Sequence, residues 1–251
     1  MGALVGGIYA AGKLDVYSNW VKALTRTDVF RLLDLSFVWT GLFKGERIID
    51  LLRHLVGEQN IEDLPISYTA VATDIETGKE VWLNRGPLFD AVRASMAIPM
   101  VFTPYDYQGS KLVDGGLVNP VPIAPTLNDR SDITIAGKDE PVPQPTAPSN
   151  KPTSNNNRYS RAIKRFIAEF HSSAAHGRPP EWGFFDVVSR SFDTMQSTAR
   201  LKLAAYSPDV IIEIPRNACR MMEFYRASEM IELGRRKAES MLRPLLSPDH
   251  V

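Results

Sequence analysis

Hydrophobic and polar positions follow two different periods along the chain, so a mixture of helices and strands is predicted. Apolar residues at helical spacing predict helices over 45–55, 89–95, 158–175, 184–206 and 223–242. Runs of β-branched and aromatic residues predict strands over 66–74, 79–83, 132–136 and 208–215. Turns at Thr77-Gly78 and Gly109 predict two hairpins, the first joining 66–74 to 79–83. Strands that alternate with helices indicate an α/β layered fold.

The first twelve residues are small and apolar, with no polar side chain to cap a helix start. Chain ends usually lie at the solvated surface, so such an opening is unusual. We therefore expect residues 1–12 to form a buried helix whose preceding turn and strand are missing. The segment is as apolar as a signal peptide but lacks the basic leader, and a cytoplasmic protein is expected.

Composition changes after the first half of the chain. Residues 138–157 are rich in Pro, Thr, Ser and Asn, and too poor in apolar residues to form a core. This predicts a core at 1–137, a flexible linker or insertion at 138–157, and a helical region at 158–251 whose late strand completes the core. The aromatic segment 36–43 is broken by glycine and predicts a loop or a flap. Its Phe37, Trp39 and Phe43 are compatible with contact to an acyl chain or a membrane surface, and equally with core packing.

Charge and chemistry exclude several classes of protein. Lys and Arg total 29 and Asp and Glu total 29, so no overall field directs the chain to nucleic acid. The single cysteine excludes an intrachain disulfide and suits a reducing compartment. No apolar run reaches the ~18 residues of a membrane span. The four histidines lack metal-ligand spacing, so neither a metal nor an organic cofactor is expected.

Three blocks carry the chemical signal. The chain opens on Met-Gly-Ala-Leu-Val-Gly-Gly, residues 93–104 read Arg-Ala-Ser-Met-Ala-Ile-Pro-Met-Val-Phe-Thr-Pro, and residues 112–122 read Leu-Val-Asp-Gly-Gly-Leu-Val-Asn-Pro-Val-Pro. In order and spacing they resemble the patatin-like phospholipase family, and residues 190–214 resemble its bacterial cytoplasmic members. Gly2 matches the last glycine of the family's Gly-x-Ser-x-Gly nucleophile elbow.

The resemblance implies a patatin-like three-layer α/β hydrolase core with added C-terminal helices. It also implies hydrolysis of acyl esters of phospholipids or lysophospholipids by a Ser–Asp dyad, with Asp114 as the base. A carboxylate held close to a serine and partly desolvated is able to take its proton. Gly115 and Gly116 are expected to clear side chains from the approach to that serine. Ser95 lacks the elbow's surroundings and is expected to be structural.

The same comparison places the nucleophilic serine immediately before Met1, and the glycine-rich oxyanion turn earlier still. The chain as written is therefore expected to be an N-terminally truncated, inactive form, most simply through a misplaced start. The alternative is a non-catalytic lipid-binding remnant or pseudoenzyme. Segment 7–14 also matches Gly-x-x-x-x-Gly-Lys, but it ends in Leu14 where a nucleotide-binding loop needs Ser or Thr, so no nucleotide partner is expected.

Overall fold

The computed structural model describes residues 1–34, 41–127, 131–139, 208–215, 218–219 and 223–246. Every element below belongs to the unit formed by Met1–Pro141 and Phe192–Val251. The predicted helices at 158–175 and 184–206, and all but the first two residues of the predicted linker at 138–157, lie outside the described residues.

Helices make up much of the described chain. They are α1 (Gly2–Ala10), α2 (Leu14–Ala23), α3 (Arg26–Leu32), α4 (Glu46–Val56), α5 (Leu88–Ser95) and α8 (Ala227–Leu242), with short 3₁₀ turns η1 (Ile61–Asp63), η2 (Gly115–Leu117), η3 (Ala124–Thr126), η5 (Phe224–Arg226) and η6 (Arg243–Leu246). The helices predicted at 1–12, 45–55, 89–95 and 223–242 are confirmed. Two helices, α2 and α3, were not predicted. The reciprocal capping box of Thr25 and Asp28 is a visible signal for α3.

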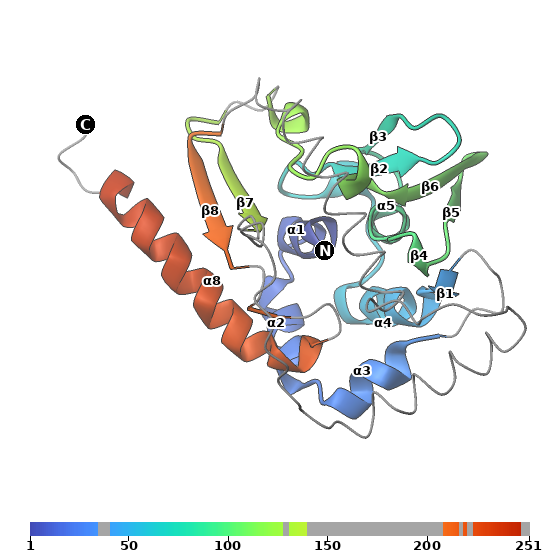
Figure 1. Cartoon of the computed structure of the whole chain (residues 1–251), viewed down its shortest axis with the longest axis horizontal. Helices are drawn as coiled ribbons and strands as arrows, with labels where there is room; N and C mark the ends of the chain where they lie inside the picture. Colours follow the sequence, from blue (N-terminus) through green and yellow to red (C-terminus); the bar gives the residue numbers. More distant parts are fainter. Residues whose placement is uncertain (35–40, 128–130, 140–207, 216–217, 220–222, 247–251) are drawn as a thin grey trace, which may run out of the picture. The chain divides into compact units, whose positions relative to one another are not determined.

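The strands form three small sheets (Figure 1). Strands β3 (Glu80–Leu83), β2 (Ala70–Asp74), β6 (Ser110–Asp114) and β5 (Tyr105–Tyr107) pair antiparallel in that order, and both predicted hairpins are present. The parallel pairs are β1 (Gly41–Phe43) with β4 (Met100–Phe102), and β7 (Ile135–Asp139) with β8 (Val210–Ile214). The α/β class is confirmed.

Two strand predictions need correction. Strand β7 begins at Ile135 and runs to Asp139, rather than covering 132–136, because its pairing with β8 sets its ends. Residues 41–43, predicted as part of a loop or flap, form β1 through backbone pairing with β4. Neither pairing is visible in local composition.

One apolar cluster connects the helices to the antiparallel sheet. Helix α5 packs on β2, β5 and β6, and α1 packs on α5 and β2. The burial predicted for residues 1–12 is only partly right. Leu4 and Ile8 are buried, whereas Met1, Val5 and Tyr9, one helical turn apart, are exposed. Within the described residues, no helix is long and apolar enough to cross a membrane.

Candidate active site at Asp114

Asp114 ends β6 and caps the 3₁₀ turn η2. Its backbone N–H donates to the Ala97 carbonyl at 3.0 Å, and its own carbonyl accepts from Thr73 Oγ1 at 3.1 Å. Its Oδ1 accepts from the Gly116 N–H at 2.6 Å. The segment after α5, a side chain on β2 and the turn itself therefore hold Asp114 in one place.

Gly115 is required by the close approach of the turn to β2. A Cβ at this position would lie 2.3 Å from the Val71 carbonyl oxygen and 2.6 Å from its carbon. The same oxygen accepts from Ser95 Oγ at 2.6 Å, so the hydroxyl hydrogen of Ser95 is already used. Ser95 is buried at the end of α5 and is structural, as predicted. The obstruction that Gly115 avoids is thus the strand β2, whereas the sequence suggested a clear path to a serine.

Burial and neighbouring charges act in opposite directions on Asp114. Its half-buried carboxyl has a raised pKa because desolvation disfavours the charged form. The Gly116 N–H and the positive amino group of Met1 both lower that pKa. The amino end of α1 therefore lies close enough to Asp114 to act on its charge.

Two contacts hold α1 in this position. The Tyr68 hydroxyl donates to the Ala3 carbonyl at 2.8 Å, and burial raises the pKa of that phenol, which keeps it protonated. A Cβ on Gly7 would lie 2.9 Å from Leu88 Cδ1 and 3.2 Å from the Tyr68 ring, so glycine allows the close packing of α1. Gly2, the predicted end of the elbow, is exposed, and among the described atoms nothing lies within 4 Å of an added Cβ.

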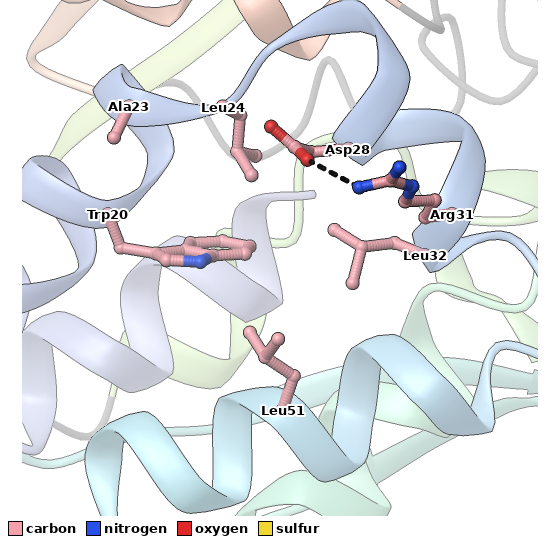
Figure 2. A pocket seen from close by; sticks show the side chains of 7 residues that line it. All are labelled: Trp20, Ala23, Leu24, Asp28, Arg31, Leu32 and Leu51. Atoms are coloured by element: carbon pink, nitrogen blue, oxygen red, sulfur yellow. Dashed lines mark ion pairs between the residues drawn. The ribbon is translucent and has the colours of Figure 1, made fainter.

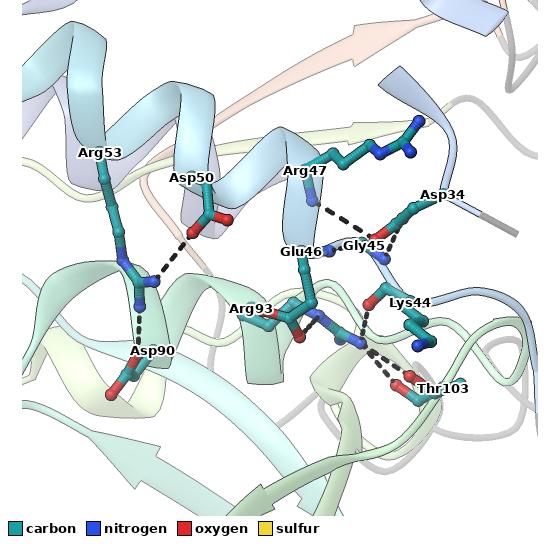
Figure 3. A network of polar contacts seen from close by, with 10 residues as sticks. All are labelled: Asp34, Lys44, Gly45, Glu46, Arg47, Asp50, Arg53, Asp90, Arg93 and Thr103. Carbon is teal, nitrogen blue, oxygen red and sulfur yellow. Dashed lines mark hydrogen bonds and ion pairs between the residues drawn. The ribbon is translucent and has the colours of Figure 1, made fainter. Parts of the chain in front are cut away.

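A buried arginine in the last turn of α5 holds the carboxyl end of this helix (Figure 3). Arg93 Nη2 donates to the Lys44 carbonyl and, at 3.0 Å each, to the Thr103 carbonyl and hydroxyl. Its guanidinium also lies over the Phe102 and Tyr105 rings. Burial lowers the pKa of Arg93, and Glu46, 3.8 Å away, raises it. Arg93 opens the block 93–104, but no signal in the sequence indicates which carbonyls it binds.

A second feature of Figure 3 fixes the start of α4. The Asp34 carboxylate accepts from the backbone N–H groups of Gly45 at 2.6 Å and Glu46 at 3.0 Å. Gly45 has a φ of 77°, which glycine adopts without strain. The network therefore joins the residues that follow β1 and begin α4 to the last turn of α5.

An open cavity of about 330 Å³ lies between α2, α3 and α4 (Figure 2). Apolar side chains form most of its wall, and Asp28 and Arg31, 3.9 Å apart, add an exposed ion pair; the apolar residues are Trp20, Ala23, Leu24, Leu32 and Leu51. None of the predicted site residues lines it, so it is separate from the site at Asp114.

The other candidates from the sequence gain no support as sites. Segment 7–14 is helical through Ala10 and does not form a phosphate-binding loop. His54 is exposed on α4 and its Nδ1 lies 2.7 Å from the Asp50 carbonyl; His171, His176 and His250 lie outside the described residues. In the described part of the chain, no three His, Cys, Asp or Glu residues are grouped as metal ligands.

Comparison with known proteins agrees with this geometry. The family profile described as patatin-like phospholipase matches residues 1–127. Uncharacterized NTE family proteins of Mycobacterium bovis and Mycobacterium tuberculosis are each 38% identical over 291 aligned residues, covering 96% of this chain and 81% of the relative. A neuropathy target esterase of Drosophila persimilis is 32% identical over 49% of this chain and 9% of its own length.

The profile match over residues 1–127 and the 38% identity over 96% of the chain define the family. The chain belongs to the patatin-like phospholipase family. Membership places it among the lipid hydrolases.

Proposed function

We propose that this protein is a serine acyl-ester hydrolase acting on phospholipids or lysophospholipids, with Asp114 as the general base. The nucleophile is a serine joined directly to Met1, in an elbow that ends at Gly2. The observation that carries the proposal is the Asp114 carboxylate itself, which is half-buried at the end of β6 and held by the Gly116 N–H at 2.6 Å, within the family match to residues 1–127.

The environment of Asp114 suits this role. A partly desolvated carboxylate has a raised pKa and is a stronger base than an exposed one, while the Gly116 N–H keeps it oriented. Asp114 takes the serine proton as the serine oxygen attacks the ester carbonyl. The proton then passes to the departing alcohol as the ester bond breaks, leaving an acyl-enzyme. Water gives its proton to Asp114, attacks the acyl group and releases the fatty acid, and the serine recovers the proton.

This proposal predicts that residues 1–251 by themselves have no esterase activity, because they contain no Gly-x-Ser-x-Gly sequence. Loss of a serine nucleophile costs about 10⁶ in rate in a serine protease. The single cysteine also favours a reducing, cytoplasmic compartment. The substrate head group and any peripheral membrane contact are left to the assay.

The test compares residues 1–251 with an extended chain that adds the residues encoded in frame before Met1. Both are assayed on lysophosphatidylcholine by release of fatty acid. We expect the extended chain alone to be active, and Asp114→Asn to lower its rate about 10²- to 10⁴-fold. The matched control is Asp106→Asn on the neighbouring strand, whose exposed carboxylate pairs with Lys111 at 2.7 Å. Equal activity of Asp114→Asn and wild type, or an in-frame stop codon directly before Met1, would overturn the proposal.

A further inference from the structure

Asn119 lies just after the Asp-Gly-Gly turn and is buried, with 3% of the residue's surface exposed. Its Nδ2 donates to both carboxylate oxygens of Glu80 on β3, at 3.1 and 3.0 Å. Its backbone N–H donates to the Gly115 carbonyl at 2.9 Å. Asn119 therefore contacts both the turn that carries Asp114 and a strand on the far side of β2.

The strand register turns these contacts into a closed loop. Glu80 is paired with Thr73 of β2, and Thr73 Oγ1 donates to the Asp114 carbonyl at 3.1 Å. The first residue of the segment 114–119 is thus attached to Thr73, and the last is attached to the strand partner of Thr73. Both ends of the turn are tied to neighbouring positions of one sheet, which fixes the path of the chain between them.

The amide is held at this position at a cost to stability. Its Oδ1 is buried and has no hydrogen-bond donor among the described residues. A buried acceptor without a donor lowers stability, and an apolar side chain would avoid that loss. Proteins accept such local costs mainly at functional sites. The Nδ2 group of the amide, which donates to Glu80, is the part that fixes the end of the turn.

We propose that Asn119 is a positioning residue for catalysis, which holds the Asp114 turn in register by its bonds to Glu80 and Gly115. This inference rests on the proposed role of Asp114 as the base. Asn119 acts through the turn: when its bond to Glu80 is lost, the Gly116 N–H is no longer held against the Asp114 carboxylate. A shift of about 1 Å in a catalytic group can lower the rate about 10²-fold.

The kinetic test uses the extended chain and lysophosphatidylcholine. Asn119→Asp keeps the size of the side chain but places a carboxylate against Glu80. We expect kcat to fall about 10- to 100-fold with KM within about twofold, since a buried positioning residue acts on the reacting group and not on ground-state binding. Loss of the Gly116 N–H bond raises the pKa of Asp114, so the acid limb of the rate–pH profile should move to higher pH. The double variant Asn119→Asp with Glu80→Gln reverses donor and acceptor and should recover most of the loss.

A second measurement does not depend on activity. Amide hydrogen exchange of the peptide 112–120 should become faster in Asn119→Asp, while exchange in α5 stays unchanged. The matched control is Asn60→Ala, which removes an exposed amide–carboxylate bond of 3.3 Å to Asp63 and should change neither exchange nor kinetics.

The outcomes separate the two proposals. If Asp114→Asn is fully active, the proposed function fails, and the exchange data still decide whether Asn119 holds the turn. If activity depends on Asp114 but Asn119→Asp keeps the wild-type kcat, pH profile and exchange, the positioning role alone is overturned. If Asn119→Asp does not fold, the double variant Asn119→Asp with Glu80→Gln decides the question. The positioning role is contradicted if that double variant folds but its kcat is no higher than the kcat of Asn119→Ala.

Discussion

Gly115→Ala tests whether the Asp114 turn depends on its close approach to β2. The added Cβ would lie 2.3 Å from the Val71 carbonyl oxygen, whereas carbon and oxygen ordinarily approach to about 3.3 Å. Strand β2 has little freedom to move, because it is paired on both sides and the Val71 carbonyl already accepts from Ser95. The turn must therefore shift by about 1 Å, the difference between these two distances.

Overpacking of this kind costs about 1–3 kcal/mol, and a clash with backbone belongs at the upper end of that range. For a chain of 251 residues, a loss of about 2–3 kcal/mol lowers the melting temperature by roughly 4–12 °C. The assay is thermal unfolding followed by circular dichroism. In the extended chain, kcat for lysophosphatidylcholine should also fall about 100-fold, because Asp114 moves with the turn.

The matched control is Gly234→Ala in α8, where no described atom lies within 4 Å of an added Cβ. Alanine in a helix interior should raise stability there by about 0.5–1 kcal/mol. If Gly115→Ala melts like the wild type while Gly234→Ala is stabilised, the turn does not require glycine and the reasoning from the Val71 distance is wrong.

Three further substitutions test other contacts by thermal melting. The raised pKa of Asp114 means that folded protein keeps this proton to higher pH than unfolded chain, so its carboxyl lowers stability as pH rises above about 4. Asp114→Asn should melt above wild type at pH 7 and lose that advantage below about pH 4; equal melting at pH 7 would count against a buried carboxylate. Arg93→Ala should cost about 1–3 kcal/mol for each of the Lys44 and Thr103 carbonyls that it leaves without this donor. Tyr68→Phe should cost about 0.5–1.5 kcal/mol by removing its hydrogen bond to the Ala3 carbonyl, and no change would exclude that bond as an anchor of α1.

Local patterns were sufficient where an element is made by its own residues. The hairpins at Thr77-Gly78 and Gly109 were predicted because turn residues and alternating side chains lie next to each other in sequence. The helices α4 and α5 were predicted from apolar spacing alone. Asp114 was singled out because its glycine-rich neighbours form a recognisable block.

Long-range pairing was not accessible in this way. Strand β1 forms only because β4, distant in sequence, lies beside it, and the ends of β7 are set by β8. The roles of Arg93 and Asn119 depend on carbonyls and carboxylates that are 10 to 49 residues away along the chain. A buried charge or amide is compatible with many sequences, and only its hydrogen-bond partners reveal what it holds.

The sequence by itself determined the α/β class, the family and the identity of Asp114 as the candidate base, because these follow from residue types and their order. Only the tertiary structure decided that Gly115 meets Val71, that Tyr68 holds α1 through the Ala3 carbonyl, and that Asn119 bonds Glu80 beside the strand partner that holds Asp114. The physical reason is that close packing and hydrogen bonds join residues distant in sequence, and the energies of those contacts exist only once the strands and helices are assembled.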